Sequence, residues 1–433
     1  MVTEEERARY MDQPDFYSDL GVIADPKGYF DRLRSKCPVA REAYHGSVMV
    51  TGYDAVMEVL SRKGDVFSSA VSTIGPIPPL PFEPVGEDIS EQLDAHREEI
   101  PWSAHLVCFD GKKHAEHRAF VTRLLTYSRL RQNEDYLKSL TDQLIDGFIG
   151  KGRCNVVSEY AHATTTYAIA DLLGIPQEDR AALLELIGAP PSQVDGDAAH
   201  KLGADPLIFL KERFDSYIRK RLQDPGTDLM SELAASRYKD GSVPNPEMLS
   251  LLARFVYGAG QDTTSRLIAM AVRILADDAG LQARLRNEPH RIPDFLEEVL
   301  RYEGPVKVIY RLAQKNTTIG GVDVPAGTVV TICLTGASND PAHFRDPAAF
   351  DIDRVGVRDN LAFSRGAHAC PGAPLARLEG RVAIERLLAR TADIRISEEH
   401  HGPADARRYR YEPTYSFRNL AELHIVFVPA AQT

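Results

Sequence analysis

Apolar residues recur at helical spacing along most of the chain. The longest such stretch runs from about Asn245 to Asp278, and shorter ones follow one another between residues 25 and 222. Three segments have strand-like patterns instead: SVMVTG, NTTIGGVDVPAGTVVTICLT and AELHIVFVP. The pattern therefore predicts a mainly α protein with a small β-sheet portion.

Two segments interrupt the helical pattern. The run IGPIPPLPFEP holds five prolines in eleven residues, so residues 72–101 are predicted to form an ordered loop or a lid rather than a regular helix. The second, residues 187–205, is rich in turn-forming residues. Neither has the composition of a linker, so we predict a single domain over residues 1–433, in which about residues 1–15 form a short polar N-terminal segment.

Charge and composition narrow the functional classes. The chain has 51 basic and 62 acidic residues, a net charge of −11 that is spread without long blocks, which argues against a nucleic-acid partner. No window approaches the ~20 apolar residues that a membrane span needs, so we expect a cytoplasmic protein with no membrane partner. The five cysteines show no metal-type or disulfide-type spacing.

One cysteine has an unusual position. Pro371 follows Cys370, and a periodic helical pattern runs on to about Ala389. Proline is favoured at the first helical position, so we expect Cys370 at the N-cap, where unpaired N–H groups and the helix dipole favour a thiolate. Gly366 and Gly372 would let the backbone approach a large flat group. Three hypotheses remain open on this pattern: a nucleophile, a ligand of haem iron, or a cysteine packed at a helix start.

The surrounding segment resembles the haem-binding loop of the cytochrome P-450 family, the soluble bacterial haem-thiolate monooxygenases. The resemblance is carried by Phe363, Gly366, His368, Cys370 and Gly372. It implies a cytochrome P-450 fold in which haem b lies between a long distal helix and the proximal cysteine loop, with Cys370 as the iron ligand. The family usually has a glycine where this chain has Ser364. This difference bears on the geometry of the local turn and not on the identity of the iron ligand.

A charge cluster also matches the family. Glu298 and Arg301 in EEVLR resemble the family's ExxR motif, and Arg354 in FDIDR is similar to its third member. Residues three apart share a helix face, so an ion pair is sterically natural. We expect this trio to hold the haem-binding loop and to take no part in the chemistry.

The haem propionates need cationic or hydrogen-bonding partners. The resemblance nominates His114, Arg118, Arg311 and His368. His117 is expected to lie elsewhere, because the family pattern places histidine and arginine four residues apart.

The segment GAGQDTTS in the long helix resembles the family's distal motif. Ala259 and Gly260 would let haem and O2 approach the backbone. The hydroxyl groups of threonines can bond a carbonyl one turn back and open a local groove. Asp262 and Thr263 are therefore predicted to be the catalytic pair that relays protons.

Other expectations concern the substrate and the electron donor. The predicted substrate walls are apolar, which indicates an apolar small molecule: they comprise Ile74, Leu80, Phe82, Trp102, Val306, Val308, Ile309 and the 187–205 loop. We expect Lys307 to be solvated, with a substrate carboxylate as its alternative partner. Electrons should come from NAD(P)H through a ferredoxin or flavodoxin-type protein, which would dock on a proximal patch of Lys112, Lys113, Arg358 and Arg365.

Two other functions fit the same motifs. One is peroxide-driven oxidation or oxidative coupling, which would not need Thr263. The other is a non-catalytic haem gas sensor, which needs an axial ligand but no proton relay. The intact Asp262–Thr263 pair favours the monooxygenase, which uses O2 as its co-substrate.

Overall fold

The computed structural model describes residues 14–62, 65–188 and 207–430. Most of the polar N-terminal segment and of the 187–205 loop therefore lies outside the described residues. The long helices of the described part are α3 (Pro26–Lys36), α4 (Tyr53–Ser61), α6 (Gly111–Leu124), α8 (Glu134–Ile149), α9 (His162–Leu173), α10 (Gln177–Gly188), α12 (Lys211–Gln223), α14 (Pro246–Asp277), α15 (Ala279–Asn287), α16 (Ile292–Glu303) and α18 (Ala373–Arg390).

Shorter helices connect these elements. They are α2 (Leu20–Ala24), α5 (Ser90–His96), α7 (Tyr127–Gln132), α13 (Leu229–Ala234), α17 (Leu334–Ser338) and α19 (Glu398–His401). None of the helices in the described residues is long and apolar enough to cross a membrane.

The strands form three small sheets. A five-stranded sheet has the order β1-β2-β8-β5-β3, a three-stranded sheet has the order β4-β10-β9, and β6 pairs with β7. Their bounds are β1 Val39–Arg41, β2 Val48–Val50, β3 Phe67–Ser68, β4 Arg153–Asn155, β5 Val308–Ala313, β6 Thr317–Ile319, β7 Val322–Val324, β8 Val329–Cys333, β9 Thr391–Ile396 and β10 His424–Pro429. The mainly α fold with a small β-sheet portion is confirmed.

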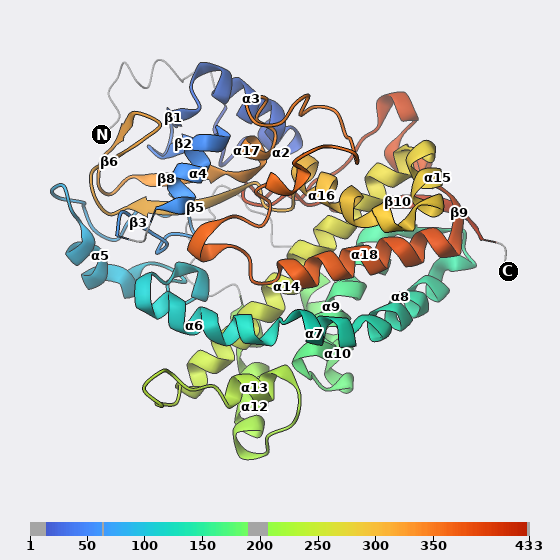
Figure 1. Ribbon diagram of the computed structural model, residues 1–433, viewed down its shortest axis with the longest axis horizontal. Helices are drawn as coiled ribbons and strands as arrows, with labels where there is room; N and C mark the ends of the chain where they lie inside the picture. The colour runs from blue at the N-terminus through green and yellow to red at the C-terminus, as the bar shows by residue number, and fades with distance from the viewer. Residues whose placement is uncertain (1–13, 63–64, 189–206, 431–433) are drawn as a thin grey trace.

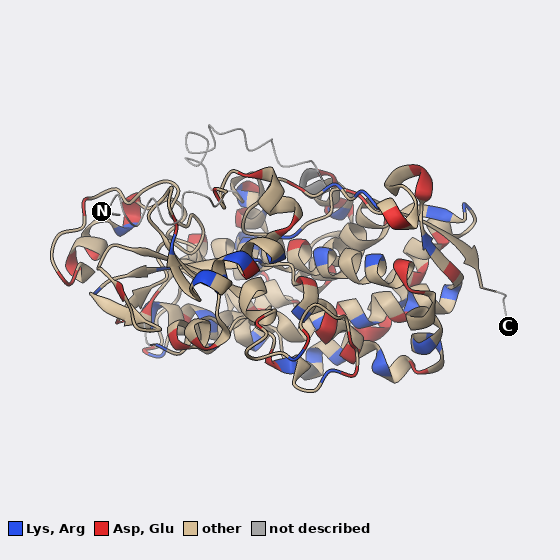
Figure 2. Cartoon of the chain, turned by 90° about the horizontal axis from the view of Figure 1, so that it is seen from above, with Lys and Arg blue, Asp and Glu red and all other residues tan. Residues whose placement is uncertain are grey.

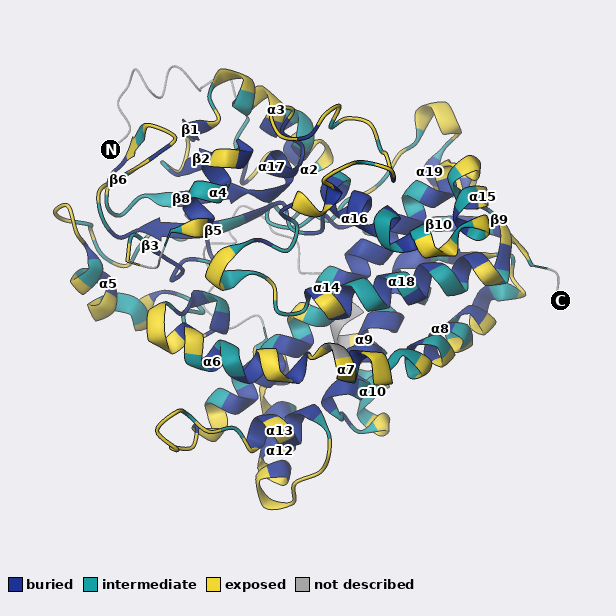
Figure 3. Ribbon diagram, viewed as in Figure 1, coloured by how far each residue is buried: buried dark blue, intermediate teal, exposed yellow. Residues whose placement is uncertain are grey.

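The largest sheet and the helices occupy different parts of the molecule. Figure 1 shows the five-stranded sheet with α3 and α4 at the upper left, the helices α6 to α13 below, and α14 running through the middle. Figure 3 shows that α14 and α18 are among the most buried helices. Two hydrophobic clusters use side chains of α14, one containing Leu267 to Val272 and the other containing Leu249 to Tyr257. The two halves of α14 are thus packed into two different hydrophobic clusters, which fix the position of its central turn.

The boundaries of α14 follow from its capping residues. The Asn245 side chain accepts hydrogen bonds from the N–H groups of Glu247 and Met248, and Pro246 occupies the first turn. The helix then continues unbroken to Asp277, so its glycines do not interrupt it. The predicted span from Asn245 to Asp278 is confirmed, with these two residues as the caps.

The proline-rich segment is less uniform than predicted. Residues 72–82 form turns, but Ser90–His96 is a helix and Arg97–Glu99 a 3₁₀ turn. The prediction of one loop over residues 72–101 is therefore wrong for its second half. The helical part is stabilised by Leu93, which is fully buried in the cluster beneath the sheet.

Candidate active site

The loop that carries Cys370 is shaped by two left-handed residues. Gly366 has φ 74°, and a Cβ there would come within 2.3 Å of the backbone oxygen of Leu60, so only glycine fits. Ser364, which stands where the family usually has glycine, also has a positive φ of 57°. The loop keeps the backbone conformation that glycine would adopt, at a cost in strain for a serine. The Cys370 N–H donates to the Phe363 oxygen at 2.8 Å and closes the loop.

The sulfur lies before the helix rather than at its N-cap. Helix α18 starts at Ala373 with Gly372 as N-cap, and Pro374 rather than Pro371 occupies the first turn. The N-cap prediction for Cys370 is therefore wrong by two residues. The chain turns at residues 371–372 before the helix starts, and this turn still brings the N–H groups of Gly372 and Ala373 to the sulfur.

Cys370 is classed as exposed as a whole residue, although the surrounding protein desolvates its sulfur. This desolvation raises the pKa of the thiol, and the N–H groups of Gly372 and Ala373 and the charge of Arg118 oppose that effect. The helix terminus alone therefore does not lower the pKa of the thiol, contrary to the prediction from the sequence. A bound cation would supply the missing stabilisation, because metal ligation deprotonates a thiol.

Four basic side chains predicted to bind propionates lie together beside this loop. His114 stacks on His368 with ring centroids 3.8 Å apart and an interplanar angle of 22°. His368 Nε2 is 3.0 Å from Ser69 Oγ, and Arg118 donates to the Ala369 oxygen. Arg311, on β5, donates to Ser72 Oγ at 3.1 Å and to its neighbour's oxygen, that of Tyr310, at 2.6 Å.

Burial and neighbouring positive charges lower the pKa values of these groups. Burial, followed by the charge of Arg118, lowers the pKa of His114 to about 4. Burial, followed by the charge of Arg311, lowers the pKa of His368 to about 2, and burial lowers the pKa of Arg311 to about 10. None of the four forms an ion pair with a carboxylate of the described residues. Two charged arginines and two neutral histidines, none of them in an ion pair with a described carboxylate and all beside Cys370, fit the two propionates and the iron of a haem.

His117 lies outside this cluster, as expected. Its ring contacts Phe109, Phe120 and Tyr238, and its nitrogens bond the Lys113 oxygen at 2.7 Å and the Tyr238 hydroxyl at 3.0 Å. It is a buried core histidine.

The central turn of α14 carries the predicted catalytic pair. Thr263 Oγ1 donates to the Ala259 oxygen at 3.0 Å, which is the bond one turn back that the sequence predicted. Ala259 is exposed, whereas the Gly260 backbone approaches Ile169 of α9. A Cβ at Gly260 would make only ordinary contact, at 3.4 Å, so packing against α9 does not require glycine there.

Asp262 has a partner that sequence reasoning missed. Arg266, four residues further along the helix, donates to both carboxylate oxygens of Asp262, at 2.6 and 2.8 Å from Nη2. The Asp262 side chain is 28% exposed and that of Arg266 only 7%. The spacing of four was a signal that could have revealed this pair.

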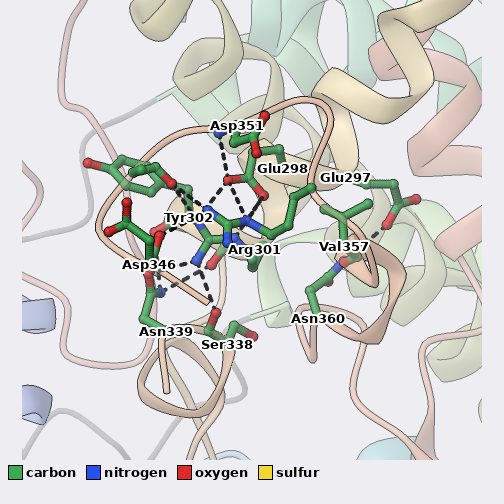
Figure 4. A network of polar contacts seen from close by, with 12 residues as sticks. Glu297, Glu298, Arg301, Tyr302, Ser338, Asn339, Asp346, Asp351, Val357 and Asn360 are labelled. Carbon is green, nitrogen blue, oxygen red and sulfur yellow. Dashed lines mark hydrogen bonds and ion pairs between the residues drawn. The ribbon is translucent and has the colours of Figure 1, made fainter. Parts of the chain in front are cut away.

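The predicted ExxR trio forms one buried network, and Figure 4 shows its Glu298 and Arg301. Arg301 donates from Nε and Nη2 to the two oxygens of Glu298 at 2.7 and 2.8 Å, and both side chains are fully buried. Arg354 Nε lies 3.1 Å from both Glu298 oxygens. Arg301 also bonds Asn339 and the Ala349 oxygen. The network thus ties α16 to the chain segment that precedes the cysteine loop.

The predicted substrate walls divide into two groups. Ile74 and Val308 are only 2% exposed and belong to the core on one face of the five-stranded sheet. Both are committed to the core, so neither offers free surface to a substrate. Leu80, Phe82, Trp102, Val306 and Ile309 keep exposed surface, but the first three pack against this cluster, whereas Val306 and Ile309 pack on the cluster that contains Val48.

Lys307 is not solvated, so that expectation is wrong. Its side chain is 1% exposed and its Nζ donates to the Thr414 oxygen at 2.7 Å. The backbone explains the burial, because the Lys307 N–H pairs with the Ser416 oxygen and draws the side chain beneath the 411–418 turn.

Known proteins match this chain in sequence and in structure. Residues 198–391 match the family model described as Cytochrome P450. Cytochrome P450 144 of Mycobacterium tuberculosis is 30% identical over 396 residues, which cover 87% of this chain and 85% of the relative. The chain belongs to the cytochrome P450 family. Cytochrome P450 monooxygenase PikC of Streptomyces venezuelae is 35% identical over 389 residues, covering 87% of this cytochrome P450 and 88% of PikC.

The structural match is closer still. The substrate-free form of Mycobacterium marinum cytochrome P450 CYP150A6 is 46% identical, with a TM-score of 0.89 and coverage of 97% of this chain and 99% of that one. This cytochrome P450 is accordingly an oxidoreductase of the monooxygenase type, and membership of the family implies the use of haem and O2.

Proposed function

We propose that this cytochrome P450 inserts one oxygen atom from O2 into an apolar organic substrate by hydroxylation or epoxidation. The observation that carries the proposal is the pairing of two sets of groups. The Cys370 thiol lies beside basic side chains that have no acidic partner among the described residues, and α14 presents an acid and an alcohol on adjacent residues. The first set suits a haem and the second suits proton delivery.

Each group has a defined task. Cys370 ligates the iron, and the N–H groups of Gly372 and Ala373 stabilise negative charge on its sulfur. His114, Arg118, Arg311 and His368 bind the propionates, while Phe363 and Gly366 shape the loop and Ala259 and Gly260 leave room on the distal side. When bound, haem b supplies an iron that activates O2.

Protons reach the reaction through Asp262 and Thr263. The carboxylate of Asp262 is partly exposed, so water can exchange protons with it once it turns from Arg266. The Thr263 hydroxyl donates to the Ala259 oxygen and keeps its own lone pairs available to accept a proton. The two side chains thus provide an acid in contact with solvent and, on the next residue, an alcohol that would pass the proton on.

Electrons come from NAD(P)H through a ferredoxin or flavodoxin-type protein that docks beside the cysteine loop. The N-terminus of α6 lies there because His114 stacks on His368, and its Lys112 side chain is 89% exposed. Arg365 donates to the Arg358 oxygen at 2.7 Å, and the Arg358 side chain is 63% exposed. These residues, together with Lys113, provide a local positive surface on an otherwise acidic protein.

Two measurements test the proposal. Replacement of Cys370 by alanine should abolish the thiolate-type visible spectrum of the reduced carbon monoxide complex, and an unchanged spectrum would show that the ligand is wrong. The wild-type enzyme, supplied with a ferredoxin, its reductase and ¹⁸O₂, should place one labelled oxygen atom in an apolar product. Label that stays entirely in water would contradict oxygen insertion.

A further inference from the structure

Lys307 is a buried amine at the start of β5. Its N–H donates to the Ser416 oxygen at 2.8 Å, and its Nζ to the Thr414 oxygen at 2.7 Å. The preceding residue, Val306, pairs with Phe417 in an isolated β-bridge. One turn of the chain, residues 414–417, therefore fixes both the backbone and the amine.

The amine has more donors than partners. A lysine ammonium carries three N–H donors, and the Thr414 oxygen takes one of them. No carboxylate of the described residues pairs with it. Burial, followed by the nearby charges of Arg418 and Arg266, lowers the pKa of Lys307 to about 7. A charge buried in this way is costly unless an anion joins it.

The two arginines are themselves incompletely satisfied. Arg418 pairs with Glu303 at 3.2 Å, but Arg273 shares that carboxylate. Arg266 pairs with Asp262, yet its Nη1 is buried with no hydrogen-bond partner among the described residues. Glu303 and Asp262 are the carboxylates that pair with these arginines, and neither of them pairs with the Lys307 amine. The local charge balance has room for another negative group.

This cationic group adjoins the turn of α14 that carries the catalytic pair. The guanidinium of Arg266 lies over the Phe417 ring, 4.8 Å from its centroid. Arg266 is one helical turn from Asp262, so the 414–417 turn connects Lys307 with the reaction site. Val306, Ile309 and Phe417 are partly exposed and supply apolar surface beside it.

We propose that Lys307 and Arg266 bind the carboxylate of the substrate, which is an apolar carboxylic acid. The acid accepts hydrogen bonds from the free N–H groups of Lys307 and from Arg266 Nη1, while its hydrocarbon part contacts the apolar side chains. This assignment rests on the proposed monooxygenase function and narrows its substrate class. It also accounts for a buried lysine that contributes no ion pair to the fold.

Matched ligands test the assignment on the holoenzyme. Dodecanoic acid and dodecan-1-ol have the same chain, and only the acid is anionic. Wild-type enzyme should bind the acid about tenfold more tightly than the alcohol, as for one charge-assisted hydrogen bond. Lys307→Met keeps the length of the side chain and removes its charge, so it should abolish the preference and leave binding of the alcohol unchanged. Lys315→Met, on the surface beside Asp88, should behave as wild type.

Proton uptake provides a second measurement that does not depend on turnover. The amine is faced by Arg418, which pairs with Glu303, and by Arg266, which pairs with Asp262. At about pH 8, a carboxylate bound beside the mostly neutral amine should draw in close to one proton, which calorimetry in buffers of different ionisation enthalpy detects. Wild type should show this uptake with dodecanoic acid and Lys307→Met should not.

The outcomes separate the two proposals. Equal affinity for acid and alcohol in wild type, or an acid preference that survives in Lys307→Met, would overturn the carboxylate site even if oxygen is inserted. An acid preference that depends on Lys307, in an enzyme that places no oxygen in any ligand, would support the site and contradict the proposed reaction.

Discussion

Thr263 and Asp262 are adjacent residues with different kinds of partners. The Thr263 hydroxyl bonds a backbone oxygen of its own helix, so its position is fixed by α14 alone. The Asp262 carboxylate is held by a side chain, Arg266, which can release it by a rotamer change. The alcohol is therefore the static member of the pair and the acid the movable one.

Replacement of Thr263 by alanine should leave haem content and ligand binding intact but divert electrons to peroxide. The alanine removes the hydroxyl group that accepts and passes on the proton, together with its hydrogen bond to the Ala259 oxygen. The ratio of product to NAD(P)H consumed should fall by about tenfold or more, within the range of general acid–base contributions. Thr264→Ala, on the buried side of the helix, is the control.

The same variant distinguishes the alternative reaction. Full activity of Thr263→Ala with hydrogen peroxide, together with undiminished coupling with O2, would favour peroxide-driven oxidation and remove Thr263 from the relay.

Glu379 on α18 gives a pH-dependent prediction. It is 1% exposed, and neither carboxylate oxygen has a partner among the described residues. Burial raises its pKa well above the usual value, so the folded protein holds the proton that the unfolded chain releases above about pH 4.3. Its contribution is therefore most favourable below that pH and is lost as pH rises towards the folded pKa.

The variant Glu379→Gln removes this titration. Relative to wild type, the variant should gain up to about 3 kcal/mol of unfolding free energy between about pH 5 and pH 7, from the linkage slope of about 1.4 kcal/mol per pH unit. Urea unfolding of the holoenzyme at several pH values measures the gain. Parallel pH profiles for the two proteins would show that Glu379 is not held neutral.

Single residues were predictable where a motif defines them. Cys370, Arg311 and the ExxR pair lie in patterns that name both residue and spacing, and the structure brings each together with its expected neighbours. Arg266 and Lys307 belong to no such pattern. The partner of Arg266 could be found from its spacing to Asp262, but the burial of Lys307 depends on a turn more than a hundred residues away, which local sequence does not encode.

At the scale of elements, one helix is joined to the loop before the cysteine by charge. Glu298 of α16 lies between two arginines, and all three side chains are buried or nearly so. Removing one partner of a buried ion pair leaves the other charges without compensation, which costs more than the pair contributes.

Glu298→Gln should therefore lower the unfolding free energy by about 3–5 kcal/mol and reduce haem retention. Denaturant unfolding and the haem content of purified protein measure both effects. Glu288→Gln removes one of the two surface partners of Arg284, which keeps its ion pair with Asp353, and should leave both measurements nearly unchanged. A Glu298→Gln protein with wild-type stability would contradict the structural role of the network.

Helix boundaries were predictable where capping residues define them and not where a turn intervenes. Asn245 and Pro246 identify the start of α14, and the structure agrees. Pro371 suggested an equally clear start for α18, but the helix begins two residues later than expected because the chain first turns at residues 371–372. Strand β9 was not among the predicted strands; it follows α18 directly and is defined by its pairing with β10, which lies about thirty residues further along the chain.

At the scale of the whole molecule, charge is mixed rather than segregated. Figure 2 shows basic and acidic residues interspersed over the visible elements. The proposed docking surface is therefore a local excess around the cysteine loop, and its effect should depend on ionic strength because its side chains are exposed.

The double variant Lys112→Glu, Arg358→Glu should slow electron transfer from an acidic ferredoxin by about tenfold at low salt and flatten its salt dependence. Stopped-flow reduction of the haem measures the rate. Lys220→Glu, on exposed α12 surface far along the chain, changes net charge without touching the loop. An equal effect of both changes would indicate general charge rather than a docking surface.

The contact between Arg418 and Ile23 has a consequence for how the protein is made. Arg418 Nη1 donates to the Ile23 oxygen at 2.5 Å, across 395 positions of sequence. The ribosome must therefore synthesise nearly the whole polypeptide before this hydrogen bond can form. The Lys307 amine also depends on this late segment, because its hydrogen-bond acceptor is the Thr414 oxygen. A nascent chain arrested before residue 414 would therefore be a helix-rich intermediate in which Lys307 and its neighbouring arginines are still uncovered.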